Sequence, residues 1–196
     1  MNCSLMKYAR IVLWLIKTHF MKSITRIETY NATPEQVFKC IDDLGVTGMH
    51  MTQSSMMMMG SKLNVGFLTE NHIGLGTKYK WTGKMMGMPM DFTVEVTKWI
   101  SPKEKIWETI GGTKLIIYSW FRMQLIILPT LNGCKVELSI SYEKPKGFIN
   151  KILSFLFADW YCNWCLKHRL GDAKKSLELS LISTKHFKTK DYEINS

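Results

Sequence analysis

The chain has 196 residues, of which 46% are hydrophobic, and this length can bury a sizeable core within one globular domain. Its five cysteines are odd in number and irregularly spaced, which argues against a disulfide framework and favours a reducing, cytosolic setting. The net charge of +10 implies attraction to anionic surfaces, either nucleic acid or acidic lipid. Nucleic acid is not an expected partner, because no helix-turn-helix, zinc-finger spacing or aromatic–basic RNA motif accompanies the charge.

Residues 1–20 differ from the rest of the chain, because they carry Lys7, Arg10 and Lys17 and no acidic residue. The apolar run over residues 11–16 is far shorter than the roughly 20 residues that a membrane span needs. No small-residue cleavage site of a signal peptide follows it. Two interpretations stay open. The segment is a basic amphipathic helix on an anionic membrane surface, which makes a cytoplasmic protein peripheral to a membrane, or it is an upstream translation extension.

The first elements of the domain are predicted from residues 22 to 48. Several β-branched residues over 22–30 predict a strand. The run NATPEQVFKCIDD then predicts a helix, with Thr33 as N-cap and Pro34 at the first helical position. Gly45 and Gly48 are expected to end it. A second short helix or a loop follows.

Apolar residues then alternate with polar ones. The runs MDFTVEVTKW (90–99) and CKVELSISYE (134–143) each predict a half-buried antiparallel strand with one wet face. The run KLIIYSWFRMQLII (114–127) predicts a longer and more apolar strand. Turn residues such as Gly111 and Gly112 separate these runs, so we expect about six strands after the first helices.

The last predicted element is one long helix, from about Gly147 to about Leu181. Its first half, FINKILSFLFADWYCNWCL, has 14 apolar residues among 19. A helix packed on a sheet needs only one apolar stripe, so the surplus is expected to face a cavity with its ligand, a membrane or another subunit. The residues after about Thr184 are polar and expected to be loose.

Three motifs resemble those of the START-like (SRPBCC) superfamily: ATPEQVFKCIDDL, GLGTKYKW and DFTVEVTKWISPKEKIWET. They most closely resemble small polyketide cyclase/dehydrase and lipid-transport-like proteins. The resemblance implies an α+β helix-grip (START/Bet v1-like) fold. In that fold a curved antiparallel sheet of about seven strands surrounds a long C-terminal helix, two short helices follow the first strand, and an apolar cavity lies between. The chain divides into a leader (1–20), a helix-grip domain (21–182) and a polar tail (183–196).

The residues expected to line this cavity are mostly aromatic, aliphatic or sulfur-containing side chains from the strands and the long helix. They are Met57, Tyr79, Trp81, Met90, Phe92, Val94, Ile117, Ser119, Phe121, Met123, Leu138, Tyr142, Leu153, Phe157, Trp160 and Trp164.

The methionines of MHMTQSSMMMMG (49–60) and the cluster over residues 85–90 are expected to form adaptable walls or a lid of the cavity. Plain surface or core methionine, and a copper(I) site through Met49, His50 and Met51 with the later run, are the alternatives.

No complete catalytic or metal motif is present. Polar groups that would steer a reaction inside the cavity are Glu108, Ser119, Arg122 and Tyr142, but they form no recognised catalytic set. Three-residue steps on the long helix would let a metal bridge the side chains of Cys162, Cys165 and His168, although buried cysteine acting as a small hydrophobe is commoner. No cofactor or metal is therefore expected.

We expect a non-enzymatic binder or carrier of a hydrophobic small molecule or lipid. The first alternative is a cavity enzyme of the polyketide cyclase/dehydrase type, aromatase/cyclase-like in its chemistry. The second is a protein-interaction module that uses the same groove.

Overall fold

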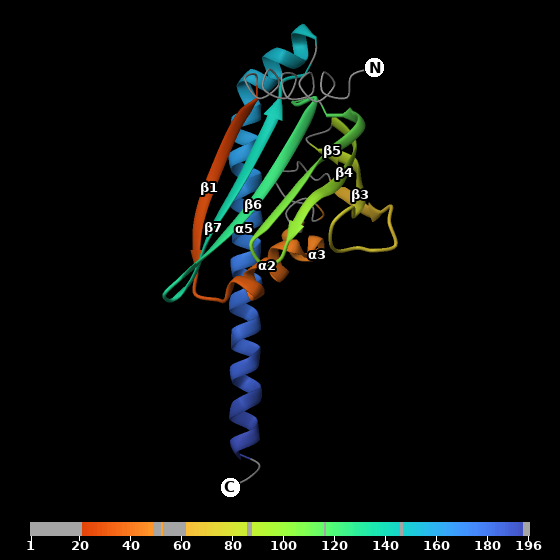
Figure 1. Ribbon diagram of the computed structural model, residues 1–196. Helices are drawn as coiled ribbons and strands as arrows, with labels where there is room; N and C mark the ends of the chain where they lie inside the picture. Colours follow the sequence, from red (N-terminus) through yellow and green to blue (C-terminus); the bar gives the residue numbers. More distant parts are fainter. Residues whose placement is uncertain are drawn as a thin grey trace, which may run out of the picture.

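The computed structural model describes residues 21–48, 52, 62–85, 88–115, 117–145 and 147–193 (Figure 1). The leader and most of the methionine-rich run, including Met57, lie outside the described residues. The elements in chain order are β1 (Lys22–Tyr30), α2 (Pro34–Asp42), α3 (Leu44–Thr47), β2 (Leu63–Phe67), β3 (Lys78–Met85), β4 (Met88–Ile100), β5 (Glu104–Lys114), β6 (Trp120–Thr130), β7 (Gly133–Glu143) and α5 (Phe148–Glu193).

The strands form one antiparallel seven-stranded sheet in the order β1-β7-β6-β5-β4-β3-β2. Consecutive strands are neighbours except β1, which pairs with the last strand. The sheet curves around α5, and α2 and α3 lie near one end of the sheet, beside the middle of α5 (Figure 1). This arrangement is the helix-grip fold, so the predicted α+β fold is confirmed, including the two short helices after the first strand.

The start of α2 follows the sequence prediction closely. Thr33 is the N-cap, and its hydroxyl oxygen accepts a hydrogen bond from the main-chain N–H of Gln36 at 3.3 Å. The Gln36 side-chain oxygen accepts in return from the Thr33 amide at 3.0 Å, which completes a capping box. Val37, Phe38 and Ile41 are buried, so the helix presents its apolar face to the core.

One stripe of buried side chains packs α5 on its neighbours. The stripe is fully buried and recurs every four or seven residues, a spacing that keeps it on one face of the helix. Its residues are Ala158, Cys162, Leu166 and Ala173. They form the buried stripe of a helix that contacts α2, α3, β1 and β7. Tyr30 of β1 adds a buried hydrogen bond from its hydroxyl to a main-chain carbonyl oxygen of α5, at 2.9 Å.

Two boundaries differ from the sequence predictions. Residues 114–127 are not one strand: β5 continues through Gly111 and Gly112 to Lys114, and β6 begins only at Trp120. Between them the Tyr118 ring is drawn into the core, where it is 2% exposed, and this anchoring overrides strand alternation.

The second difference is that α5 continues to Glu193, beyond the predicted end near Leu181. Neither glycine nor proline occurs after Gly171 to end it. Within the described residues, no helix combines the length and the apolarity required to cross a bilayer.

Candidate ligand-binding pocket

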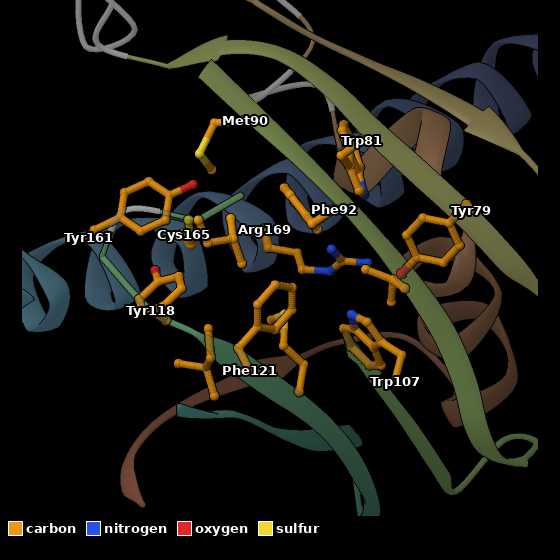
Figure 2. A pocket seen from close by; sticks show the side chains of 14 residues that line it. Tyr79, Trp81, Met90, Phe92, Trp107, Tyr118, Phe121, Tyr161, Cys165 and Arg169 are labelled. Atoms are coloured by element: carbon orange, nitrogen blue, oxygen red, sulfur yellow. The ribbon is translucent and has the colours of Figure 1, made fainter. Parts of the chain in front are cut away.

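An apolar pocket of about 60 Å³ lies between the sheet and α5 (Figure 2). Its walls come from the inner faces of β3 to β7, from the segment between β5 and β6, and from one face of α5. The lining residues are Tyr79, Trp81, Met90, Phe92, Val94, Trp107, Leu115, Tyr118, Phe121, Met123, Ile140, Tyr161, Cys165 and Arg169.

Strand register brings the sheet residues together. Alternate residues of a strand share a face, so Tyr79 and Trp81 of β3 both point inward. They pair with Val94 and Phe92 of β4, respectively. Farther across the sheet, Met123 of β6 pairs with residues of both β5 and β7 that line the same pocket. The sheet wall is therefore a continuous patch, although its residues are far apart in the sequence.

Aromatic rings stiffen this wall. Phe92 and Phe121 pack edge to face, with ring centroids 5.7 Å apart. The Tyr118 ring lies 6.1 Å from the rings of both Phe121 and Tyr161, so it links the sheet to α5. The side chains that can reshape the pocket are the two methionines of the lining, which are flexible.

The helix contributes Tyr161, Cys165 and Arg169, which are spaced by four residues and therefore share one face. Figure 2 shows the Arg169 side chain extending from α5 into the pocket, with its guanidinium group near Tyr79 and Trp107. Its Cζ lies 4.9 Å from the Trp107 ring centroid. The pocket thus combines an apolar wall with one cationic group.

Arg169 is deeply buried, with 5% of its surface exposed. Its Nε and Nη2 atoms have no hydrogen-bond partner among the residues that the structure describes. Burial lowers the pKa of Arg169, an effect opposed by Tyr79, Cys165, Asp42 and Asp172. Arginine nevertheless stays protonated in proteins, so the group carries a buried positive charge.

A buried ion pair lies next to this charge. Lys105 of β5 donates to Asp42 Oδ1 of α2, and the other carboxylate oxygen of Asp42 accepts from Trp99 Nε1 at 3.0 Å. The Lys105 ammonium also lies 5.1 Å from the Trp107 ring centroid. Lys105 and Asp42 therefore compensate each other, whereas Arg169 has no ion pair of this kind within the described part of the chain.

The remaining polar groups of the pocket stay neutral. Burial raises the pKa of the Tyr79, Tyr118 and Tyr161 hydroxyls above their ordinary value. Burial also raises the pKa of the Cys165 thiol to about 12. Among the described lining residues, then, no group titrates near neutral pH. These hydroxyls suit hydrogen bonding rather than general acid–base catalysis.

Seven of the residues predicted for the cavity line this pocket. They are Tyr79, Trp81, Met90, Phe92, Val94, Phe121 and Met123. All seven come from the strands β3, β4 and β6. Their contact with a ligand remains a prediction.

Other predicted residues lie elsewhere. Ile117 and Leu138 are buried in the core outside the lining. The Tyr142 hydroxyl donates to Asp159 Oδ1 at 2.5 Å. Ser119 is exposed and donates to a main-chain carbonyl oxygen at 3.2 Å. Leu153 is half-buried and also lies outside the lining.

The predicted aromatic residues of α5 are out of phase with the pocket. Phe157 and Trp160 are both 44% exposed, and Trp164 is buried outside the lining, stacked on Tyr161 with centroids 5.8 Å apart. The pocket is instead faced by Tyr161 and Cys165, each one residue later than a predicted position. One residue rotates a helix position by about 100°. The surplus apolar surface of α5 is exposed at Phe148, Ile152, Phe155, Leu156, Phe157 and Trp160.

Sequence reasoning missed half of the lining, namely Trp107, Leu115, Tyr118, Ile140, Tyr161, Cys165 and Arg169. Ile140 was readable, because it alternates with polar residues of β7. Tyr118 was hidden in the run interpreted as one strand. Arg169 carries no local signal, since an arginine on a helix normally faces solvent.

The proposed steering and metal-binding residues do not converge. Glu108 and Arg122 approach each other at 3.9 Å and are only partly buried, outside the pocket lining. Cys162 Sγ lies 3.7 Å from the Tyr118 hydroxyl, and His168 Nδ1 lies 2.9 Å from a main-chain oxygen of α5. The described residues include no group of three or more potential ligands that could hold a metal ion.

A second depression of about 670 Å³ lies between α2, α3, β2 and the adjoining loops. Its lining includes charged side chains such as Glu35, Lys39 and Asp43. Four of the residues that line this depression are charged, whereas Arg169 is the one charged residue that lines the pocket against α5, so the latter better suits a hydrophobic ligand.

A curved sheet that encloses an apolar pocket against a long C-terminal helix defines a protein with the helix-grip fold. Solved structures of other proteins share this fold. The protein TTHA0849 from Thermus thermophilus is 15% identical, with a TM-score of 0.62 over 81% of this chain and 99% of that chain. The Zhui aromatase/cyclase from Streptomyces sp. R1128 is 11% identical, with a TM-score of 0.59 over 80% and 96% of the two chains.

Norcoclaurine synthase from Thalictrum flavum, solved in complex with dopamine and hydroxybenzaldehyde, is 16% identical, with a TM-score of 0.55 over 82% of this chain and 87% of that chain. No protein-family model and no curated protein sequence matches the chain. These likenesses confirm the predicted helix-grip fold.

Proposed function

We propose that the chain binds or carries a hydrophobic small molecule in the pocket between the sheet and α5. The observation that carries this proposal is the pocket's lining, which is almost entirely aromatic, aliphatic or sulfur-containing. Burying apolar ligand surface there contributes about 2.5 kcal/mol per 100 Å², before the costs of association. A neighbour in fold was solved with two small aromatic molecules, which supports a ligand of that kind.

The pocket's volume of about 60 Å³ limits what enters without rearrangement. Pockets that hold drug-sized ligands measure about 300–1,000 Å³. A ligand larger than a few heavy atoms therefore requires side chains of the lining to rearrange, and we propose that Met90 and Met123 do so. Methionine is suited to such repacking because its side chain is unbranched.

Enzymatic activity of the aromatase/cyclase type is the second candidate, because the Tyr118 and Tyr161 hydroxyls border the pocket. Their raised pKa values make them hydrogen-bond donors but poor proton carriers at neutral pH. This favours binding over catalysis.

We also propose that the chain acts in the cytoplasm, at an anionic membrane surface contacted by residues 1–20.

Titration with Nile red, a neutral environment-sensitive dye, tests the binding proposal. We expect about one equivalent per chain. Met123→Trp fills the pocket and should weaken binding at least tenfold. Gln124→Trp is the matched control, because the next residue of β6 points to the opposite face of the sheet. Unchanged dye binding in folded Met123→Trp would contradict the proposal.

A further inference from the structure

We propose that the pocket selects hydrophobic molecules that carry a carboxylate, and that Arg169 binds this group. The inference rests on the proposed function, because it names the chemical class of ligand for the same pocket. It depends on one side chain that is buried, charged and directed into the pocket, and whose Nε and Nη2 have no hydrogen-bond partner within the described part of the chain.

The geometry of the unpartnered atoms matches a carboxylate. Nε–H and one N–H of Nη2 point the same way along one edge of the planar guanidinium group. This edge forms two parallel hydrogen bonds to the two oxygens of a carboxylate. Both nitrogens of that edge lack a partner among the described residues.

The acidic neighbours of Arg169 are otherwise engaged. Both oxygens of Asp42 accept hydrogen bonds, one from Lys105 and the other from Trp99. Asp172 lies three residues farther along α5, is only half-buried and has interactions of its own. Lys105, a second buried cation, is neutralised by the Asp42 carboxylate and lies outside the pocket lining. A carboxylate in the pocket therefore meets the uncompensated charge of Arg169, beside a lysine and an aspartate that already neutralise each other.

This arrangement discriminates against neutral ligands. A neutral apolar molecule would exclude water from the pocket and leave the guanidinium edge unpaired, which is costly. A carboxylate of the same shape would satisfy both donors. Hydrogen bonds to charged groups are typically strong enough to give a preference of about 10- to 100-fold.

Calorimetric titration with 2-naphthoate and 2-naphthamide at pH 7 tests the proposal, because the two probes share one flat ring system, and the amide offers one neutral acceptor oxygen where the acid offers two charged ones. In the native chain we expect the acid to bind about 10- to 100-fold more tightly than the amide. Arg169→Met should abolish this preference while the amide still binds. Arg122→Gln removes a positive charge outside the pocket and should leave the preference intact.

Equal affinity for acid and amide in the native chain, or a preference that survives Arg169→Met, would overturn the carboxylate inference. If Nile red binds but neither naphthalene probe does, the inference fails and the proposed function stands. If no probe binds, both fail.

A second measurement needs no folded Arg169→Met. The Nε–H resonance of Arg169 in ¹⁵N-labelled native chain, assigned through its loss in Arg169→Lys, should shift downfield with 2-naphthoate and not with 2-naphthamide. An unshifted resonance at saturation with naphthoate would overturn the inference.

Discussion

Replacing Arg169 by methionine should stabilise the ligand-free protein. The side chain is buried, and two of its donors lack partners among the described residues. Leaving a buried donor unsatisfied costs about 1–3 kcal/mol. The cation–π contact with Trp107 returns up to about 2 kcal/mol. Methionine keeps most of the apolar stem, so the net gain in the free energy of unfolding is about 2 kcal/mol, within the range of about 1–4 kcal/mol seen when buried ions become apolar.

Replacing a neighbouring buried cation by methionine should instead lower the free energy of unfolding. Lys105→Met leaves the buried Asp42 carboxylate without its cation and should cost about 3–5 kcal/mol. Arg122→Met, which removes a half-exposed pair, should change stability by less than about 1 kcal/mol.

Urea denaturation at pH 7, followed by far-UV circular dichroism, measures the free energy of unfolding of all three variants. A gain of about 2 kcal/mol should raise the melting temperature by about 4–8 °C in a domain of this size. A loss of more than about 1 kcal/mol in Arg169→Met would show that the guanidinium is already paired, and the reasoning would be refuted.

Three further predictions follow from other parts of the chain. Tyr30→Phe should lower the free energy of unfolding by about 1 kcal/mol in urea titrations, because it removes a buried hydrogen bond to a main-chain carbonyl oxygen of α5. Burial raises the pKa of the Cys162 and Cys165 thiols from 9.0 to about 12. Iodoacetamide at pH 8 should therefore alkylate both about a thousandfold more slowly in folded than in urea-unfolded protein, as mass spectrometry can measure. Deleting residues 1–20 should release the chain from anionic phosphatidylserine vesicles in a pelleting assay, and equal pelleting of both forms would contradict the membrane proposal.

Most of the strand residues of the pocket were predictable from the sequence, because alternation assigns each side chain to a face. Phe92 and Val94 illustrate this, since every second residue from Asp91 to Thr97 is polar. The capping box at Thr33 was predictable for a similar reason, because its signal lies within a few residues. Local patterns are readable when the residues that decide a feature are neighbours in the chain.

The helix half was not predictable, because α5 carries aromatic residues all around its first turns. Trp160 and Tyr161 are adjacent aromatic residues that the sequence does not distinguish. Trp160 is nevertheless partly exposed, whereas Tyr161 lines the pocket. The phase of the helix is set by the buried Ala158 and Cys162 stripe, which packs on distant elements. Arg169 could be recognised as a pocket residue only once strands far away in the sequence enclosed it.

The crystal structure of the chain with 2-naphthoate tests the central claim most directly. We expect the naphthalene ring in the pocket between Phe92, Phe121 and Tyr161. Its carboxylate oxygens should lie about 2.7–2.9 Å from Nε and Nη2 of Arg169. A naphthoate bound only to the exposed apolar surface of α5 around Phe155, with the pocket empty, would contradict the account.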